Sequence, residues 1–186
     1  EHVSGSISAF AELMNARAAE LGCTNTHFVN PNGLNSDQQY TTCRDMAKIA
    51  AAAFANKTLC EIDSTLSYKF PATKAAAART ITPGHKMLYP NDSRYYAGIV
   101  GGKTGYTSKA GNTLVTCVEK NGVRMVAVIL KSKSTHYADT KKMLDYGYQY
   151  VNTEKGNTTG NSTTTTTTAK QETAGKWVQD NGSWRY

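Results

Sequence analysis

A β-hairpin signal in the second half of the chain is the feature that most constrains the fold. Apolar side chains alternate with others in Asn112–Glu119 and again in Val123–Leu130, and the pair Asn121-Gly122 lies between the two runs. Asn-Gly is the preferred pair for a tight type I′ turn, since both positions need a positive φ. The sequence therefore predicts two antiparallel strands, with a third strand leading into Lys103 beside them.

Helical spacing of apolar residues is found on both sides of this hairpin. Gly22 follows the first helical run as a stop, and Thr42 with Asp45 forms a cap-like start for the second. The predicted helices are residues 8–21, 46–55 and 134–150, short strands are expected at 66–70 and 79–82, and a turn at 89–92. Helices before and after an antiparallel sheet indicate an α+β fold in which helices flank the sheet.

The length of the chain limits the number of domains, and its charge distribution bears on nucleic-acid binding. The 186 residues, of 20.2 kDa, are enough for one domain and a tail. Lys and Arg number 21 against 14 Asp and Glu, a net charge of +7, yet no basic run or helix stripe concentrates that charge. We expect a solvated basic surface and no nucleic-acid partner. No apolar segment is long enough to cross a bilayer.

The cysteines give no metal-binding pattern. Cys23, Cys43, Cys60 and Cys117 form no C-x-x-C pair and have no ligand spacing with the four histidines. We expect no metal and no cofactor. Their pairing cannot be read from the sequence; buried free thiols are favoured, and a disulfide is the alternative in an exported protein.

The composition changes after Val151. Residues 153–174, with the run of threonines, lack large apolar side chains and are predicted to be a flexible linker. Residues 175–186, GKWVQDNGSWRY, regain aromatic side chains around Asn181-Gly182, a second hairpin signal. A new folding unit is expected to begin there.

Lys103-Thr104-Gly105 is the candidate for chemistry. Three common residues mean little alone, but GGKTGYTSKAG runs directly into the predicted hairpin, which places the motif on a sheet edge. Small residues there let a substrate backbone approach the strand, and a lysine with a hydroxyl in one cleft suits a carboxylate. The sequence predicts a carboxylate-binding site at this edge.

Several segments in order resemble the serine-type D-Ala-D-Ala carboxypeptidases, the low-molecular-weight penicillin-binding proteins of peptidase family S11. They are FAELMNARAAELGCTNTHFVNPNGL at 10–34, YTTCRDMAKIA at 40–50 and the K-T-G segment. Asn32 and Gly84-His85 depart from the family's usual histidine and asparagine. The resemblance covers residues 1–152 and implies the C-terminal part of the catalytic domain, a partial penicillin-binding-protein/β-lactamase-like transpeptidase fold.

The resemblance also implies roles for five residues. Lys103 would position a serine of another motif and the substrate carboxylate, and Thr104 and Thr107 would hydrogen-bond that carboxylate. Gly105 would keep the strand open, and the Tyr106 backbone N–H would supply half of an oxyanion hole. The implied substrate is the peptidoglycan stem peptide, cleaved through a serine acyl-enzyme, and β-lactam antibiotics would acylate the same serine.

Two motifs of such enzymes are missing. No serine in the chain is followed by lysine at the third position, and no S-x-N occurs. Without nucleophile and base the acyl-transfer cycle cannot run. We therefore expect the 186 residues to be inactive alone, as the later part of a longer exported enzyme whose earlier part carries both motifs.

The C-terminal residues carry a second resemblance. Residues 175–186 are similar to the start of a choline-binding or cell-wall-binding repeat, which implies an extracellular, wall-associated protein and a choline-bearing or other anionic wall polymer as partner. A class A β-lactamase would share K-T-G. A non-catalytic wall-binding protein on a degenerate carboxypeptidase scaffold is the second alternative.

Overall fold

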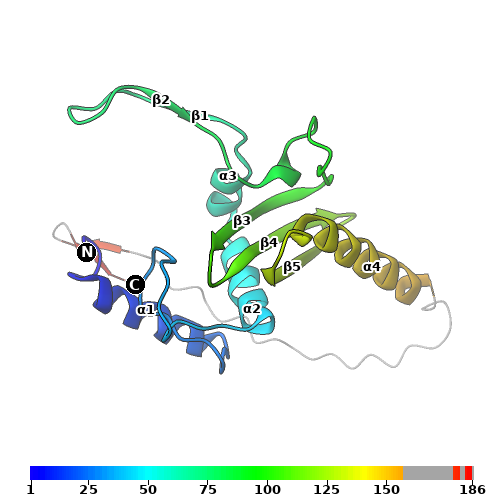
Figure 1. The fold of residues 1–186 in the computed structure, drawn as a ribbon, viewed down its shortest axis with the longest axis horizontal. Helices are drawn as coiled ribbons and strands as arrows, with labels where there is room; N and C mark the ends of the chain where they lie inside the picture. The colour runs from blue at the N-terminus through cyan, green and yellow to red at the C-terminus, as the bar shows by residue number, and fades with distance from the viewer. Residues whose placement is uncertain (157–177, 181–182, 186) are drawn as a thin grey trace.

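A three-stranded antiparallel sheet forms the centre of the molecule (Figure 1). The computed structural model describes residues 1–156, 178–180 and 183–185. The sheet has the order β3 (Ile99–Thr107), β4 (Gly111–Lys120) and β5 (Val123–Ser132). Asn121 and Gly122 have φ of 52° and 71°, as a type I′ turn requires, so the predicted hairpin is confirmed. β3, which carries K-T-G, is an edge strand.

Helices cover both faces of the sheet. Alternate residues of β4 point to opposite sides. On one side Leu114 and Val118 pack with Leu144 of α4 (His136–Gly156). On the other, Cys117 packs with Ala50 and Phe54 of α2 (Cys43–Phe54). The α+β fold with helices flanking an antiparallel sheet is confirmed.

The predicted helices lie within a few residues of their expected bounds. α1 (Ile7–Glu20) starts where the Ser6 side chain accepts a hydrogen bond from the N–H of Ala9, and Gly22 follows it with φ 72°. α2 starts where Thr42 accepts a hydrogen bond from the N–H of Asp45. α4 continues through Gly156, beyond the predicted start of the linker at 153. The rest of that linker lies outside the described residues.

Two elements were not predicted, and two others form an arm. The α-helix α3 (Lys57–Ser64) contains no buried residue, and a short 3₁₀ helix η1 spans Lys86–Leu88. β1 (Tyr68–Phe70) and β2 (Arg79–Ile81) pair with each other in a separate two-stranded sheet, which projects from the body (Figure 1). The arm and α3 together border the end of β3 that precedes K-T-G.

The described part of the tail agrees with the second hairpin signal. β6 (Val178–Asp180) pairs antiparallel with β7 (Ser183–Arg185), while the remainder of residues 175–186 lies outside the described residues. Cys23, Cys43, Cys60 and Cys117 are all free thiols. Cys23 and Cys117 are buried as expected, but Cys60 is half-buried and Cys43 is exposed. Among the described helices, none has the length and apolar character needed to traverse a membrane.

Candidate functional site

The outer edge of β3 is open beside the K-T-G motif. The N–H of Gly102 donates to Asp63 Oδ2 at 2.6 Å, so it points away from β4. Because N–H groups alternate in direction along a strand, those of Thr104 and Tyr106 point to the same free edge. The Thr104 carbonyl also lies on this edge, where it accepts a hydrogen bond from Lys103 Nζ at 2.5 Å. The edge thus offers donors and an acceptor to an extended peptide.

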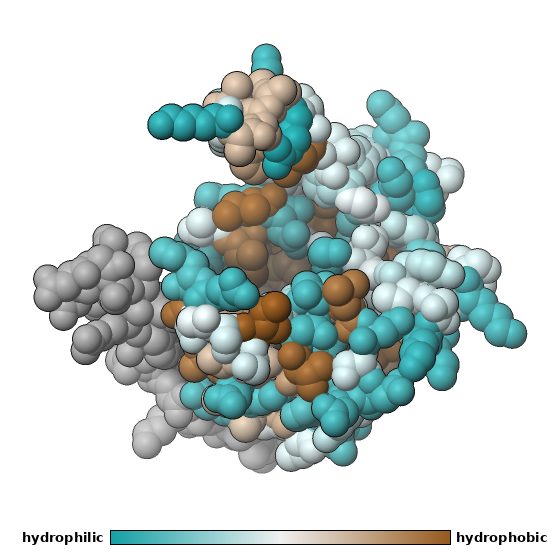
Figure 2. All heavy atoms as spheres, turned by 60° about the vertical axis from the view of Figure 1, so that its left-hand side comes forward, coloured by the Kyte–Doolittle hydropathy of each residue, from teal (hydrophilic) through white to brown (hydrophobic). Residues whose placement is uncertain are grey.

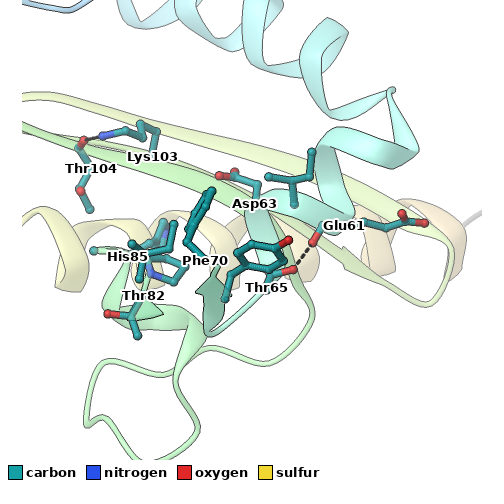
Figure 3. A pocket seen from close by; sticks show the side chains of 13 residues that line it. Glu61, Asp63, Thr65, Phe70, Thr82, His85, Lys103 and Thr104 are labelled. Atoms are coloured by element: carbon teal, nitrogen blue, oxygen red, sulfur yellow. Dashed lines mark hydrogen bonds between the residues drawn. The ribbon is translucent and has the colours of Figure 1, made fainter. Parts of the chain in front are cut away.

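Lys103 and Thr104 line the same two cavities, but their side chains do not point together into one cleft as expected from the sequence. The strand alternation directs their side chains to opposite faces of β3, and Figure 3 shows them on either side of the strand. The first cavity, of about 640 Å³, lies between β3 and the β1–β2 arm. The second, of about 890 Å³, extends along Lys103 to Thr107. K-T-G is therefore accessible and not covered by the core.

The two threonines differ in what they offer a carboxylate. Among the described residues the Thr104 hydroxyl has no hydrogen-bond partner, so its proton is available. The Thr107 hydroxyl lies 2.8 Å from Asn35 Oδ1, to which it donates, and accepts from the N–H of Ala110 at 3.0 Å. A hydroxyl has only one proton. Thr107 must therefore release Asn35 before its hydroxyl can donate to a ligand, whereas the Thr104 hydroxyl can donate without breaking another hydrogen bond.

Glycines let neighbouring side chains approach β3 closely. A Cβ added to Gly102 would lie 2.5 Å from His85 Cδ2, and one added to Gly105 would lie 2.5 Å from Thr113 Oγ1. These distances are well below an ordinary contact. Gly105 thus lets β3 lie close to the Thr113 side chain of β4.

His85 is the buried support behind the motif. It is 2% exposed, and its Nε2 lies 2.8 Å from Thr116 Oγ1 on β4. Its Nδ1 is buried without a hydrogen-bond partner in the described part of the chain. Burial lowers the pKa of His85 to about 4, so the ring is neutral near pH 7. A neutral ring packs behind Gly102 without adding charge to the site.

The loop that follows α1 faces the motif across the second cavity. Pro31, Asn32, Gly33 and Leu34 line it opposite Gly105 to Thr107. Asn32 Oδ1 accepts the N–H of Leu34 at 3.0 Å, so the asparagine at this position braces the loop itself. Lys109 Nζ and Asp37 Oδ1, 2.6 Å apart, join the end of this segment to the turn after β3.

Sequence reasoning missed three residues of the site. Asp63 lies on an unpredicted helix, and Asn35 and Asp37 come from a segment without periodicity, so no signal connected them with K-T-G. The sequence singled out His85 only as part of Gly84-His85, which stands where the resembled family usually has an asparagine. Among the described residues, no group of three His, Cys, Asp or Glu side chains could hold a metal ion.

Comparison with known proteins places the chain in a family of peptidases. A model of the peptidase S11 family, described as D-alanyl-D-alanine carboxypeptidase, matches residues 1–134. The D-alanyl-D-alanine carboxypeptidase DacF of Bacillus subtilis is 34% identical over 158 residues, 82% of this chain and 38% of that protein. DacB2 of Mycobacterium tuberculosis is 30% identical over 156 residues, 79% of this chain and 50% of that protein.

Solved structures show the same fold. The Streptomyces K15 DD-transpeptidase superposes with a TM-score of 0.69 at 30% identity, over 80% of this chain and 59% of that one. A D-alanyl-D-alanine carboxypeptidase from Mycobacterium tuberculosis H37Rv gives 0.65 at 30% identity, over 78% and 55%. The chain spans half or less of the length of the two curated relatives.

Proposed function

Because the chain belongs to the D-alanyl-D-alanine carboxypeptidase family, peptidase S11, we propose that it forms the K-T-G side of a carboxypeptidase site. The ligand is the C-terminal D-Ala-D-Ala of a peptidoglycan stem peptide. The reaction is release of the terminal D-alanine through a serine acyl-enzyme, and β-lactam antibiotics occupy the same site. The proposal is supported by the similarity of this chain to proteins named D-alanyl-D-alanine carboxypeptidase and DD-transpeptidase.

One observation carries the proposal: the free edge of β3 presents an unpaired hydroxyl, an ammonium and an open backbone N–H close together. The unpaired Thr104 hydroxyl and the Lys103 ammonium suit the terminal carboxylate. The N–H of Tyr106, two residues further along the same edge, suits the scissile carbonyl oxygen and the negative charge that develops on it. Tyr106 is 71% exposed.

These groups recognise and polarise a substrate but do not attack it. The 186 residues contain no S-x-x-K and no S-x-N. An acyl-enzyme needs an activated nucleophile as well as an oxyanion hole. We propose that this chain supplies ligand recognition and one oxyanion donor, and that the serine and its base come from residues outside the 186.

Peptide titration followed by NMR tests carboxylate recognition. Acetyl-D-alanyl-D-alanine is added to the chain, and its C-terminal amide serves as the control ligand. We expect the acid to shift the resonances of Thr104 and Tyr106 and to bind about tenfold more tightly than the amide, since a charge-assisted hydrogen bond is worth roughly 1.5–3 kcal/mol. Thr104→Val should remove that preference. Equal affinity for acid and amide contradicts the proposal.

The tail extends the proposal to the cell wall. We propose that residues 175–186 begin a wall-binding repeat and that the protein acts outside the cell, with a choline-bearing or other anionic polymer as partner. The paired strands β6 and β7 and the aromatic residues of this segment support a hairpin unit. Retention on a choline matrix, competed off by free choline, tests it; a chain truncated after residue 152 is the control.

A further inference from the structure

The loop of residues 28–39, between α1 and α2, meets the motif strand at its tip. Figure 2 shows the β1–β2 arm projecting over a hollow, so the arm side of the site is open. The loop, by contrast, makes direct contact: Asn35 Oδ1 accepts the proton of the Thr107 hydroxyl at 2.8 Å. Any ligand that uses this hydroxyl therefore competes with the loop.

The base of this loop is fixed to the rest of the molecule. His27 and Tyr40 exchange backbone hydrogen bonds of 2.9 and 3.1 Å across it. The Asn15 side chain on α1 accepts the N–H of Phe28 at 2.7 Å and donates to its carbonyl at 2.8 Å. A loop whose ends are this close together is an Ω-loop, a class that packs on its own side chains. Movement is therefore confined to the part beyond the base.

Side-chain amides brace the loop from within. Asn30 accepts the N–H of Gly33 at 2.9 Å and donates to the carbonyl of Leu34 at 3.1 Å. Gln39 accepts the N–H groups of Val29 and Asn30 at 3.1 and 3.3 Å. These hydrogen bonds join loop residues to each other, so they survive if the tip moves away from β3. The part of the loop beyond the base can therefore move as one unit.

Among the described residues, two exposed polar contacts hold the tip to the end of β3 and the turn after it. One is the hydrogen bond between Asn35 and Thr107, which are both neutral. The other is the ion pair of Asp37 with Lys109, whose side chains are 85% and 63% exposed. Water weakens an ion pair at that exposure, so it adds little to the attachment. The tip is thus weakly held.

A ligand carboxylate is a stronger acceptor than Asn35. The Thr107 hydroxyl has one proton, and its oxygen already accepts the N–H of Ala110 at 3.0 Å. A hydrogen bond to a charged acceptor is roughly twice as strong as one between neutral groups. The carboxylate therefore takes the proton, and Asn35 loses its partner on β3.

We propose, resting on the proposed function, that Asn35 is a latch that couples the position of this loop to occupancy of the K-T-G site. In the free chain the latch holds the tip against Thr107. A bound carboxylate opens the latch, and the braced loop moves away from β3 as a unit. Opening the latch costs part of the binding free energy, so Asn35 lowers the affinity of the site and favours release of the ligand.

Two substitutions of opposite effect test the latch by NMR titration of the 186-residue chain with acetyl-D-alanyl-D-alanine. Asn35→Ala removes the competing acceptor, so the peptide should bind about threefold to tenfold more tightly, which corresponds to one neutral hydrogen bond. Asn35→Asp places a charged acceptor there, so the peptide should bind about tenfold more weakly.

The matched control is another exposed amide of the same loop. The Gln38 side chain forms no hydrogen bond with a described residue, so Gln38→Ala should change the affinity by less than about twofold. In the unaltered chain, saturating peptide should shift the backbone resonances of residues 30–37 together, because the loop moves as one unit. Resonances that stay in place at saturation overturn the latch.

A second background shows whether Asn35 acts through Thr107. In Thr107→Val the hydroxyl is gone, so adding Asn35→Ala should no longer change the affinity. The latch is overturned by a gain from Asn35→Ala that persists in Thr107→Val, or by the absence of any gain in the unaltered background.

Failure of the proposed function has a different signature. If Thr104→Val binds the peptide acid and its amide as the unaltered chain does, carboxylate recognition at Thr104 is wrong. If Thr104→Val weakens binding of the acid while neither Asn35 variant changes it, only the latch is wrong.

Discussion

Gly102 places the K-T-G strand against its support. The His85 ring occupies the space beside its Cα, and the Val115 carbonyl oxygen lies 2.5 Å from where a Cβ would stand. The N–H of Gly102 itself donates to Asp63 Oδ2. The position of Lys103 and Thr104 thus depends on a residue that no motif includes.

We predict that Gly102→Ala lowers the free energy of unfolding by about 1–3 kcal/mol, the usual cost of overpacking. In a His85→Ala background the same substitution should cost less stability but still some, because the Val115 carbonyl still crowds the new methyl group. Urea denaturation measures both variants. If Gly102→Ala unfolds at the same urea concentration as the unaltered chain, the close packing of β3 is refuted.

His85 should also make stability depend on pH. Its pKa is about 4 in the folded chain, against a usual value near 6.5, because burial disfavours the charged ring. Between those values the unfolded chain binds more protons, so stability falls as pH drops from about 6.5 to 4. The slope from this one group is at most about 1.4 kcal/mol per pH unit.

Denaturation at several pH values, compared between the unaltered chain and His85→Asn, isolates this effect. The pKa of His136 is lowered too, chiefly by burial, and its contribution remains in both proteins. We expect a shallower slope below pH 6.5 in His85→Asn. Identical slopes would mean that His85 does not titrate as its burial requires.

At the scale of elements, Asp45 joins α2 to the segment after α1. It is 2% exposed, and its Oδ2 accepts the Asn25 N–H at 2.8 Å and the Thr26 hydroxyl at 2.9 Å. This segment leads into the loop that faces K-T-G. A buried carboxylate therefore helps to position one wall of the site.

Asp45→Ala should cost about 2–3 kcal/mol of stability, because it leaves two donors without their acceptor. Asp37→Ala is the matched control: its side chain is 85% exposed in a surface ion pair with Lys109, worth at most about 1 kcal/mol. The urea midpoints of the two variants give the comparison. A similar small loss for both would contradict the structural role of Asp45.

Periodicity and turn chemistry predicted most elements, and packing decided the rest. α1, α2, α4 and the β4–β5 hairpin have a buried stripe, a cap or an Asn-Gly pair that is visible in the sequence. α3 has a cap, since the Asn56 side chain accepts the N–H of Leu59, but it is eight residues long and buries no side chain, so no buried stripe marks it as a helix. The K-T-G residues were recognised from their motif, but Asp63 reaches β3 only through that helix.

At the scale of the whole molecule, the proposed function separates ligand recognition from the reaction. The chain covers only part of its relatives' length and contains no S-x-x-K. The free edge of β3 at K-T-G is nevertheless accessible, and pairing with β4 holds this strand in the sheet. Ligand binding by this chain should therefore be reversible.

Reversible binding is tested most directly with a fluorescent penicillin. Its fluorescence anisotropy is measured in the presence of the chain, before and after the chain is denatured. The drug carries a carboxylate that suits Thr104 and Lys103. We predict a rise in anisotropy that Thr104→Val weakens and that denaturation abolishes, since no serine is acylated. Label that survives denaturation, or binding indifferent to Thr104, would contradict a recognition edge that lacks its own nucleophile.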